Sequence, residues 1–183
     1  MSINQVSKID GIRISTVKSL NDARGTFIKF HPSKELENSL DSVALSCNPK
    51  HGTIRGLHFQ VEPFAEEKLI TCVQGIIFDV VVDLRPNSRT FGKWTSFELS
   101  SENALQAYLP KGVAHGFQTL MPDSIIHYSL SSTYSPEFSY AINPFGDIGI
   151  DWPITGNSVS QRDLDGISFL SAAQKYAESL NSK

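Results

Sequence analysis

Short apolar segments that recur at close spacing dominate the hydrophobic pattern of the chain. They are rich in Val, Ile, Phe, Thr and Tyr, a composition that favours strands over helices. The pattern predicts about ten strands, with polar or turn-rich loops between them. These strands are Ile12–Val17, Thr26–Phe30, Ser42–Ser46, Ile54–Gln60, Leu69–Val73, Ile76–Leu84, Thr95–Leu99, Leu105–Leu109, Gly116–Leu120 and Ile125–Leu130.

Helical periodicity is convincing only at the C-terminal end. Leu170, Ala173, Ala177 and Leu180 fall at the spacing of one helical face, behind Ser168 or Ser171 as a possible N-cap. Many short strands must close into a barrel or pack as two sheets, because open edges invite aggregation. The pattern therefore predicts an all-β jelly-roll barrel with a short C-terminal helix.

The segment Ile76–Leu84 is almost continuously apolar, which is typical of a central strand covered on both faces. It nevertheless carries Asp79 and Asp83, and buried carboxylates need partners. We interpret both as structural carboxylates, bonded to backbone or to Arg85 rather than engaged in catalysis.

The length and the charge of the chain indicate how many domains it forms and which kind of partner it binds. The 183 residues are 40% hydrophobic and fit a single domain over residues 1–183. The net charge is −3, and the Lys and Arg residues are scattered, so a small-molecule partner is favoured over nucleic acid.

The N-terminus lacks a signal-peptide pattern and no window resembles a membrane span, which predicts a cytoplasmic protein without a membrane partner. Cys47 and Cys72 are expected to be buried free thiols.

The strand Ile54–Gln60 contains His58, a candidate site residue. Strict alternation would place His58 on one face of the strand and Arg55 on the other. If both serve one site, Gly56 must form a bulge that shifts the alternation by one residue.

A second histidine follows a turn. Pro110 and Gly112 form a Pro-x-Gly turn before His115, and with Gly52-x5-His58 this arrangement resembles the two cupin motifs. A cupin metal site would need a second histidine two residues after the first, but that position is Gln60. We therefore expect no metal.

Beyond these motifs, most of the chain resembles the dTDP-4-dehydrorhamnose 3,5-epimerase family, metal-free cupins of bacterial deoxysugar biosynthesis. The similarity extends from Asp22–Phe27 to Ser160–Asp163. Its strongest segments are Ile54–Gln60, Phe78–Arg85, Thr90–Trp94, Pro110–Phe117 and Ile148–Pro153. One such segment could arise by chance, but all five in the same order as in the family could not plausibly do so.

The resemblance implies an epimerase acting at C3, C5 or both of a nucleotide-linked 4-keto-6-deoxyhexose. His58 matches the general base, Asp163 its carboxylate partner, and Tyr128 the acid that reprotonates the opposite face. A neutral imidazole suits proton abstraction at near-neutral pH, and a carboxylate fixes its tautomer. Such chemistry requires no cofactor. Without the resemblance, Asp163 would be read as a solvated turn residue and Tyr128 as core.

The same resemblance assigns substrate-binding roles. Lys68 matches a lysine near the keto oxygen, although beside Glu66 and Glu67 it could equally belong to a surface charge cluster. The other implied contacts are Arg55, His115, Tyr134, Asn48 and Gln60, together with Arg24 and Phe27. The last two match a nucleotide-binding pair that reaches the site of a second subunit, which implies a homodimer.

Two departures leave the nucleotide base open, since Lys29 and Ser46 replace a glutamate and a glutamine that are common near the base in the family. The first expectation is a dTDP sugar. A C3-only or C5-only epimerase of a dTDP or CDP sugar remains an alternative. So do a metal-dependent cupin oxygenase or isomerase and a non-catalytic sugar-binding cupin.

Overall fold

The computed structural model describes residues 3–6, 8–30, 40–155 and 158–181, so the first two residues of the N-terminal stretch lie outside it. It confirms all ten predicted strands and adds β1, β3 and β13. The strands are β1 (Ile3–Val6), β2 (Arg13–Thr16), β3 (Lys18–Asp22), β4 (Gly25–Lys29), β5 (Ser42–Asn48), β6 (Ile54–Gln60), β7 (Lys68–Gln74), β8 (Ile76–Asp83), β9 (Trp94–Ser100), β10 (Leu105–Leu109), β11 (Val113–Thr119), β12 (Ser124–Leu130) and β13 (Ser139–Ala141).

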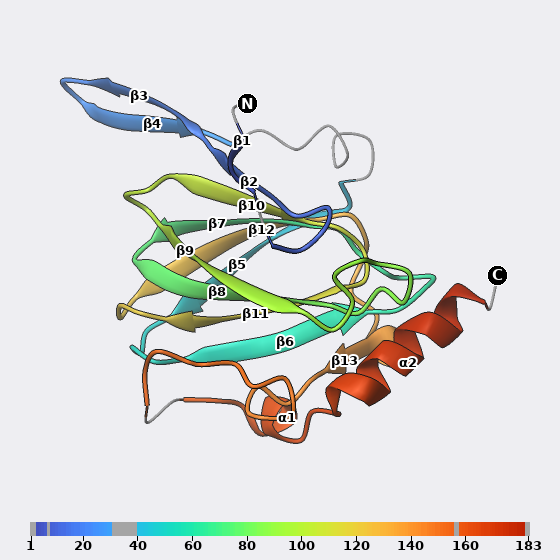
Figure 1. The fold of residues 1–183 in the computed structure, drawn as a ribbon. Helices are drawn as coiled ribbons and strands as arrows, with labels where there is room; N and C mark the ends of the chain where they lie inside the picture. The colour runs from blue at the N-terminus through green and yellow to red at the C-terminus, as the bar shows by residue number, and fades with distance from the viewer. Residues whose placement is uncertain (1–2, 7, 31–39, 156–157, 182–183) are drawn as a thin grey trace.

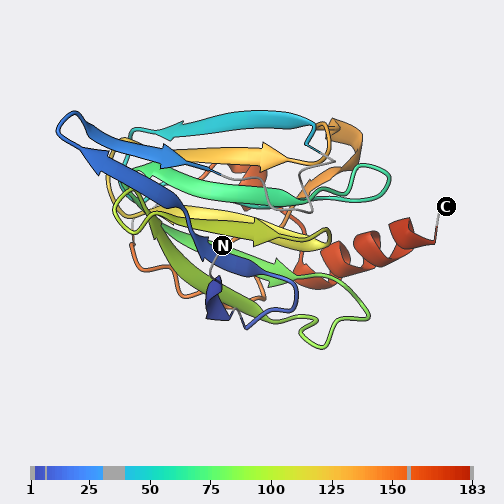
Figure 2. The same ribbon diagram turned by 90° about the horizontal axis from the view of Figure 1, so that it is seen from above.

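Two antiparallel sheets face each other in a jelly roll (Figures 1 and 2). The six-stranded sheet has the order β1-β2-β10-β7-β12-β5, and the five-stranded sheet has the order β13-β6-β11-β8-β9. The all-β prediction with a short C-terminal helix is therefore confirmed. Strands β3 and β4 form a separate hairpin that projects from one end of the molecule (Figure 1).

Aliphatic and aromatic side chains fill the space between the sheets. Ile70 and Ile126 of the six-stranded sheet belong to one buried cluster with Val81 and Phe117 of the five-stranded sheet. These residues alternate with outward-facing ones along their strands, as expected where a sheet covers a core. Burial of these side chains fixes the register of the strands that carry the site residues.

The five-stranded sheet is also covered on its outer face, by the C-terminal segment. Val80 and Val82 of β8 pack in a second buried cluster with Ala172 and Tyr176 of α2 (Phe169–Leu180). This double coverage explains the continuous apolar sequence of β8. Asp83 at its end accepts hydrogen bonds from Arg85, Ser88 and Thr90, which confirms a structural role.

Helix α2 buries only part of the predicted face, because Ala173 is buried as predicted but Leu170 is not. Ser168 is the N-cap, and its side chain accepts a hydrogen bond from the N–H of Ser171. However, Leu170 is 69% exposed, while Ala172 and Tyr176 are buried. The aromatic ring of Tyr176 packs closely over Gly112, where an added Cβ would lie 2.5 Å from the ring. A short additional helix, α1 (Gln161–Leu164), was not predicted.

Candidate functional site

A pocket of about 350 Å³ opens between the edges of the two sheets. Strand β5 is an edge of the six-stranded sheet, and β13 is an edge of the five-stranded sheet, next to β6. The open side of the jelly roll therefore gives access to its interior. The lining residues are Ala44, Leu45, Ser46, Cys47, Arg55, His58, Phe59, Gln60, Glu66, Lys68, His115, Phe117, Tyr128, Leu130, Tyr134, Ser139 and Arg162.

The predicted bulge in β6 is present. His58 pairs with His115 and Arg55 pairs with Phe117, so two residues of β6 oppose the single Gly116 of β11. Gly56 has φ +113°, and a Cβ there would lie 2.6 Å from Gly116 Cα. The close approach of the two strands thus requires glycine. As a result, Arg55 and His58 both line the pocket.

His58 and Asp163 are brought together across 105 positions of sequence. The His58 Nε2 lies 2.7 Å from Asp163 Oδ1, and the His58 side chain is 35% exposed to the pocket. Helix α1 carries Asp163, with Ser160 as N-cap. Because Nε2 is engaged by the carboxylate, Nδ1 is the ring nitrogen left to exchange a proton with a bound molecule.

The Asp163 carboxylate is held in its ionised form. Burial by itself would raise its pKa, but the hydrogen bond from His58, the His58 charge, the Gly56 N–H and Ser160 lower it below the usual value. The Gly56 N–H donates to Oδ2 at 3.2 Å. The bulge that redirects Arg55 thus also supplies a donor to this carboxylate. An ionised carboxylate at this distance can stabilise a positive charge that forms on the His58 ring during a proton transfer.

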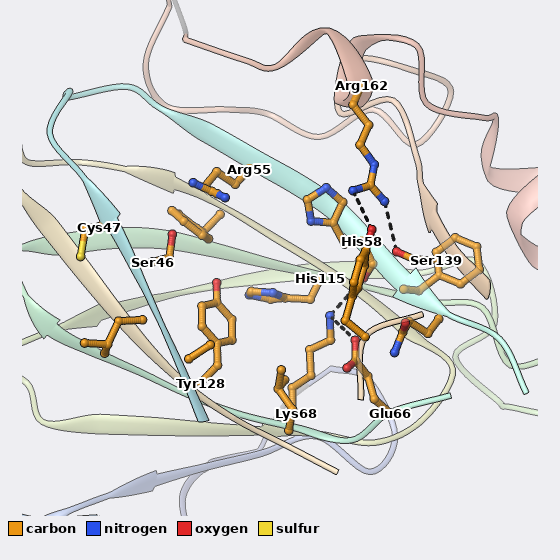
Figure 3. Close-up of a pocket in the computed structure, with 17 residues that line it drawn as sticks. Ser46, Cys47, Arg55, His58, Glu66, Lys68, His115, Tyr128, Ser139 and Arg162 are labelled. Atoms are coloured by element: carbon orange, nitrogen blue, oxygen red, sulfur yellow. Dashed lines mark hydrogen bonds and ion pairs between the residues drawn. The ribbon is translucent and has the colours of Figure 1, made fainter. Parts of the chain in front are cut away.

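Tyr128 of β12 lies on the opposite side of the pocket from His58 (Figure 3). Burial and, to a smaller extent, the Asp79 carboxylate raise the pKa of its phenol, while the Arg55 charge opposes this. The hydroxyl therefore carries its proton at neutral pH. The Tyr128 ring meets the ring of His115 edge-on, with centroids 6.0 Å apart.

His115 belongs to a second histidine–aspartate pair. Its Nε2 lies 2.8 Å from Asp79 Oδ2, and the two side chains are 4% and 0% exposed. Asp79 Oδ1 is buried and has no hydrogen-bond partner among the described residues. Burial raises the pKa of Asp79, although the charges of His115 and Lys68 oppose the rise. The partner of Asp79 is therefore His115, and not the backbone or Arg85 as predicted, and this places Asp79 directly behind the pocket.

Lys68 is buried and does not belong to a surface cluster. It is 7% exposed and lines the pocket, where its Nζ lies 3.2 Å from Glu66 Oε1 and 3.4 Å from the carbonyl oxygen of His58. Strand β7 alternates, so Lys68 points inward together with the buried core residues Ile70 and Cys72.

Two residues missed from the sequence complete one side of the pocket. Arg162 donates to the hydroxyl of Tyr134 at 3.2 Å and to Ser139 Oγ at 3.1 Å (Figure 3). Arg162 directly precedes Asp163, so the only available sequence signal was its position beside a predicted site residue. Ser139 lies on β13, a three-residue strand too short to predict.

Gln60 and Asn48 are positioned differently from the other predicted substrate contacts. Gln60 is 3% exposed, and its amide bonds the carbonyl oxygens of Phe64 and Thr133 and the N–H of Ser135. It thus braces the loop that carries Tyr134. Asn48 is 2% exposed and lies outside the pocket, where its amide bonds Ser46 and Ser124. In both residues, hydrogen bonds within the protein occupy the side-chain amide groups that would otherwise contact a substrate.

Arg24 and Phe27 lie on the β3–β4 hairpin, away from the pocket of their own chain (Figure 1). The Arg24 side chain is 90% exposed and pairs with Asp22, and Phe27 is 65% exposed. The structure therefore does not bring these two residues to His58 within one chain.

Three further sequence expectations concern cysteines, metals and membranes. Cys72 is buried as predicted, whereas Cys47 is exposed because it lies on edge strand β5 at the pocket. Within the described ranges, His, Cys, Asp and Glu residues form no cluster of three or more suited to a metal ion. None of the described helices is long and apolar enough to cross a membrane.

The pocket of this jelly roll sets a histidine–aspartate pair against a tyrosine, an arrangement suited to an epimerase, the kind of isomerase that removes a proton from one face of a carbon atom and returns one to the other. The sequence profile of the family described as dTDP-4-dehydrorhamnose 3,5-epimerase matches residues 6–170. The chain belongs to this family.

Individual relatives support the assignment. The chain is 40% identical over 167 residues to a dTDP-4-dehydrorhamnose 3,5-epimerase from Sinorhizobium fredii, covering 87% of this chain and 85% of the relative. It is 32% identical to a dTDP-4-dehydrorhamnose 3-epimerase from Streptomyces niveus, covering 87% and 80%. Among solved structures, the dTDP-4-dehydrorhamnose 3,5-epimerase from Bacillus anthracis with TDP and PPi bound matches with a TM-score of 0.85 at 35% identity, covering 91% and 98%.

Proposed function

We propose that this protein converts dTDP-4-dehydro-6-deoxyglucose to dTDP-4-dehydrorhamnose by inverting C3 and C5. The observation that carries the proposal is the His58–Asp163 pair facing Tyr128 across one pocket. Inversion beside a ketone removes a proton from one face and returns a proton to the other, so it needs two proton carriers on opposite sides.

In the proposed mechanism, His58 takes the proton from the carbon beside the keto group. The Asp163 carboxylate stabilises the imidazolium that forms, because it is ionised and 2.7 Å away. Tyr128 then donates its phenolic proton to the opposite face of the carbon. Its protonated state at neutral pH suits this step.

The enolate formed between these steps needs a cation. Lys68 lines the pocket, and its ammonium stabilises the negative charge on the enolate oxygen, as a preorganised oxyanion site does. Arg55 and Arg162 lie on the side of the pocket away from Lys68 (Figure 3). Guanidinium groups suit phosphate oxygens, so we assign the diphosphate to that side.

We also propose that the protein acts as a homodimer in which the β3–β4 hairpin completes the neighbouring site. Arg24 and Phe27 are exposed on that hairpin, and Val43 and Leu45 expose 59% and 62% of their surface on edge strand β5. Exposed apolar side chains of this kind mark association surfaces.

Mixing two variants tests the shared site. Arg24→Ala and His58→Asn should each be weak or inactive alone, but a mixed dimer contains one site with both residues intact. Recovery of activity after unfolding and co-refolding the two variants is expected. If activity stays at the level of the separate variants, Arg24 does not act on a partner's site. Light scattering of the wild type should show a dimer.

The reaction itself is tested in deuterated water with the dTDP, CDP, UDP and GDP forms of the 4-dehydro-6-deoxyhexose. Deuterium at both C3 and C5 of the dTDP sugar, followed by NMR, is the expected result. Exchange at C3 alone would place this protein with the 3-epimerase that it resembles at 32% identity. No exchange with any of the four would contradict the proposal.

A further inference from the structure

Glu66 lines the pocket but has no role in the proposed mechanism. Its side chain is 11% exposed, and its Oε1 lies 3.2 Å from Lys68 Nζ, whose side chain is 9% exposed. Among the described residues that line the pocket, it is the one carboxylate. Figure 3 shows the Glu66–Lys68 pair at the end of the pocket away from Arg55 and Arg162.

The neighbouring Glu67 shows that this placement is specific. Glu67 Oε1 accepts a hydrogen bond of 2.7 Å from the hydroxyl of Tyr108, which lies outside the pocket. Two adjacent glutamates therefore have separate surroundings. Glu66 pairs with the lysine inside the pocket, whereas Glu67 supports the outer surface of the six-stranded sheet.

Lys68 needs such a partner to be held in place. A lysine side chain is a flexible four-carbon stem with a point charge at its end, and fixing it costs conformational entropy. Its hydrogen bond to the carbonyl oxygen of His58 is long at 3.4 Å. The ion pair with Glu66 is therefore the stronger restraint on the ammonium. Because both groups are largely buried, loss of one partner leaves the other poorly compensated.

We propose that Glu66 is a positioning residue for the reaction, which holds the Lys68 ammonium where the enolate oxygen forms. The inference rests on the proposed function for the role of Lys68. Glu66 does not exchange a proton with the substrate in this account. It acts through Lys68, and this dependence makes the proposal testable.

A double-mutant cycle tests the dependence. Glu66→Gln keeps the shape of the side chain but removes its charge, and we expect kcat to fall about 10-fold to 100-fold, since displacement by about 1 Å can cost 100-fold. KM should change by less than about threefold, because an interaction made in the transition state affects kcat. Glu66→Asp, which keeps the carboxylate, should recover part of the loss.

Two comparisons show whether Glu66 acts through Lys68: the same substitution in a protein that lacks Lys68, and a matched substitution at Glu67. In a Lys68→Met background, Glu66→Gln should cause little further loss, because the group it positions is absent. Glu67→Gln makes the same charge change one residue along and should retain wild-type kcat within about twofold, because Glu67 lies outside the pocket and glutamine can still accept the hydrogen bond from Tyr108. An unchanged kcat in Glu66→Gln, or an equal loss in both backgrounds, would overturn the proposal.

A crystal structure of Glu66→Gln tests, without an activity measurement, whether Glu66 holds Lys68 in place. We expect Lys68 Nζ to leave its position beside residue 66 while the strands stay in place. An ammonium that has not moved would refute the positioning role. If the wild type exchanges no deuterium into any of the sugars, the proposed function fails, and this structure still decides whether Glu66 anchors Lys68.

Discussion

His58 and His115 are paired across strands β6 and β11, and each presents Nε2 to an aspartate at nearly the same distance. His58 lies 2.7 Å from Asp163, and His115 lies 2.8 Å from Asp79. The two pairs differ in what surrounds the carboxylate. Asp163 also accepts a hydrogen bond from the N–H of Gly56, whereas Asp79 is fully buried with one oxygen unpartnered.

The difference shifts the pKa values of the two carboxyl groups in opposite directions. Burial tends to raise both pKa values, but hydrogen bonds and the nearby histidine charge outweigh it at Asp163 and do not at Asp79. Asp163 is therefore suited to stabilise a positive charge that forms on His58, while Asp79 is suited to orient the His115 ring. His58 is also 35% exposed to the pocket, against 4% for His115. Similar distances thus support different chemistry.

Replacing each aspartate with asparagine should separate the two pairs most strongly. Asp163→Asn removes the charge that stabilises the imidazolium, so kcat should fall about 1000-fold, within the range of acid–base contributions. Asp79→Asn should lower kcat by about tenfold or less, because His115 does not exchange the proton in this account. Steady-state kinetics of both variants at one pH provides the measurement. Equal losses would remove the functional distinction.

Tyr128→Phe tests whether Tyr128, across the pocket from His58, donates the proton that completes inversion. The variant lacks the phenolic proton, so inversion should slow about 100-fold. His58 remains able to remove and return a proton on its own face, so deuterium should still enter the substrate without inversion. NMR of recovered substrate checks this prediction. Loss of exchange to the same extent as loss of inversion would show that Tyr128 serves the first step as well.

The two carboxylates should also contribute differently to the free energy of unfolding. Asp163→Asn weakens charged hydrogen bonds to His58 and Gly56 and should destabilise the protein by about 1–3 kcal/mol at neutral pH. Asp79→Asn should cost less than about 1 kcal/mol, because it also removes an unfavourable buried charge. Urea unfolding of both variants checks the order. A larger loss in Asp79→Asn would contradict it.

The pH dependence of stability should have opposite signs at the two positions. The pKa of Asp163 is lowered by folding, so its contribution is present above the unfolded pKa of about 3.9 and is lost as pH falls through the folded value. The pKa of Asp79 is raised, so its contribution is present at low pH and is lost as pH rises through the folded value.

Unfolding curves of the wild type and both variants across the acidic range test these signs. The advantage of the wild type over Asp163→Asn should shrink as pH falls below about 4. Relative to Asp79→Asn, the wild type should lose stability as pH rises. The same trend in both comparisons would be inconsistent with the opposite pKa shifts.

Much of this architecture could be predicted from sequence because apolar alternation records burial. The strands that fill the core, such as β7 and β8, have strong patterns, and the bulge at Gly56 followed from requiring Arg55 and His58 to share one site. Strand β3 was missed because Lys18–Asp22 contains a single apolar residue, Leu20, and so has no apolar alternation. Its partner β4 is nearly as exposed but contains Thr26, Phe27 and Ile28, which favour a strand.

The site could be predicted only in part, for a related reason. His58, Asp163 and Tyr128 lie in segments that resemble a family, but the pairing of Glu66 with Lys68 depends on which of two adjacent glutamates faces inward. The surroundings of Gln60 and Asn48 likewise depend on loop carbonyl groups far away in sequence. Such contacts are set by tertiary structure and leave no local pattern.

Solvent exchange in the His58→Asn variant most directly tests the central claim that His58, supported by Asp163, removes the proton. The wild type and the variant are incubated with dTDP-4-dehydro-6-deoxyglucose in deuterated water, and C3 and C5 are followed by NMR. Deuterium is expected at both carbons with the wild type and at neither with the folded variant. Wild-type rates of exchange in His58→Asn would contradict this role of His58 and place the base elsewhere.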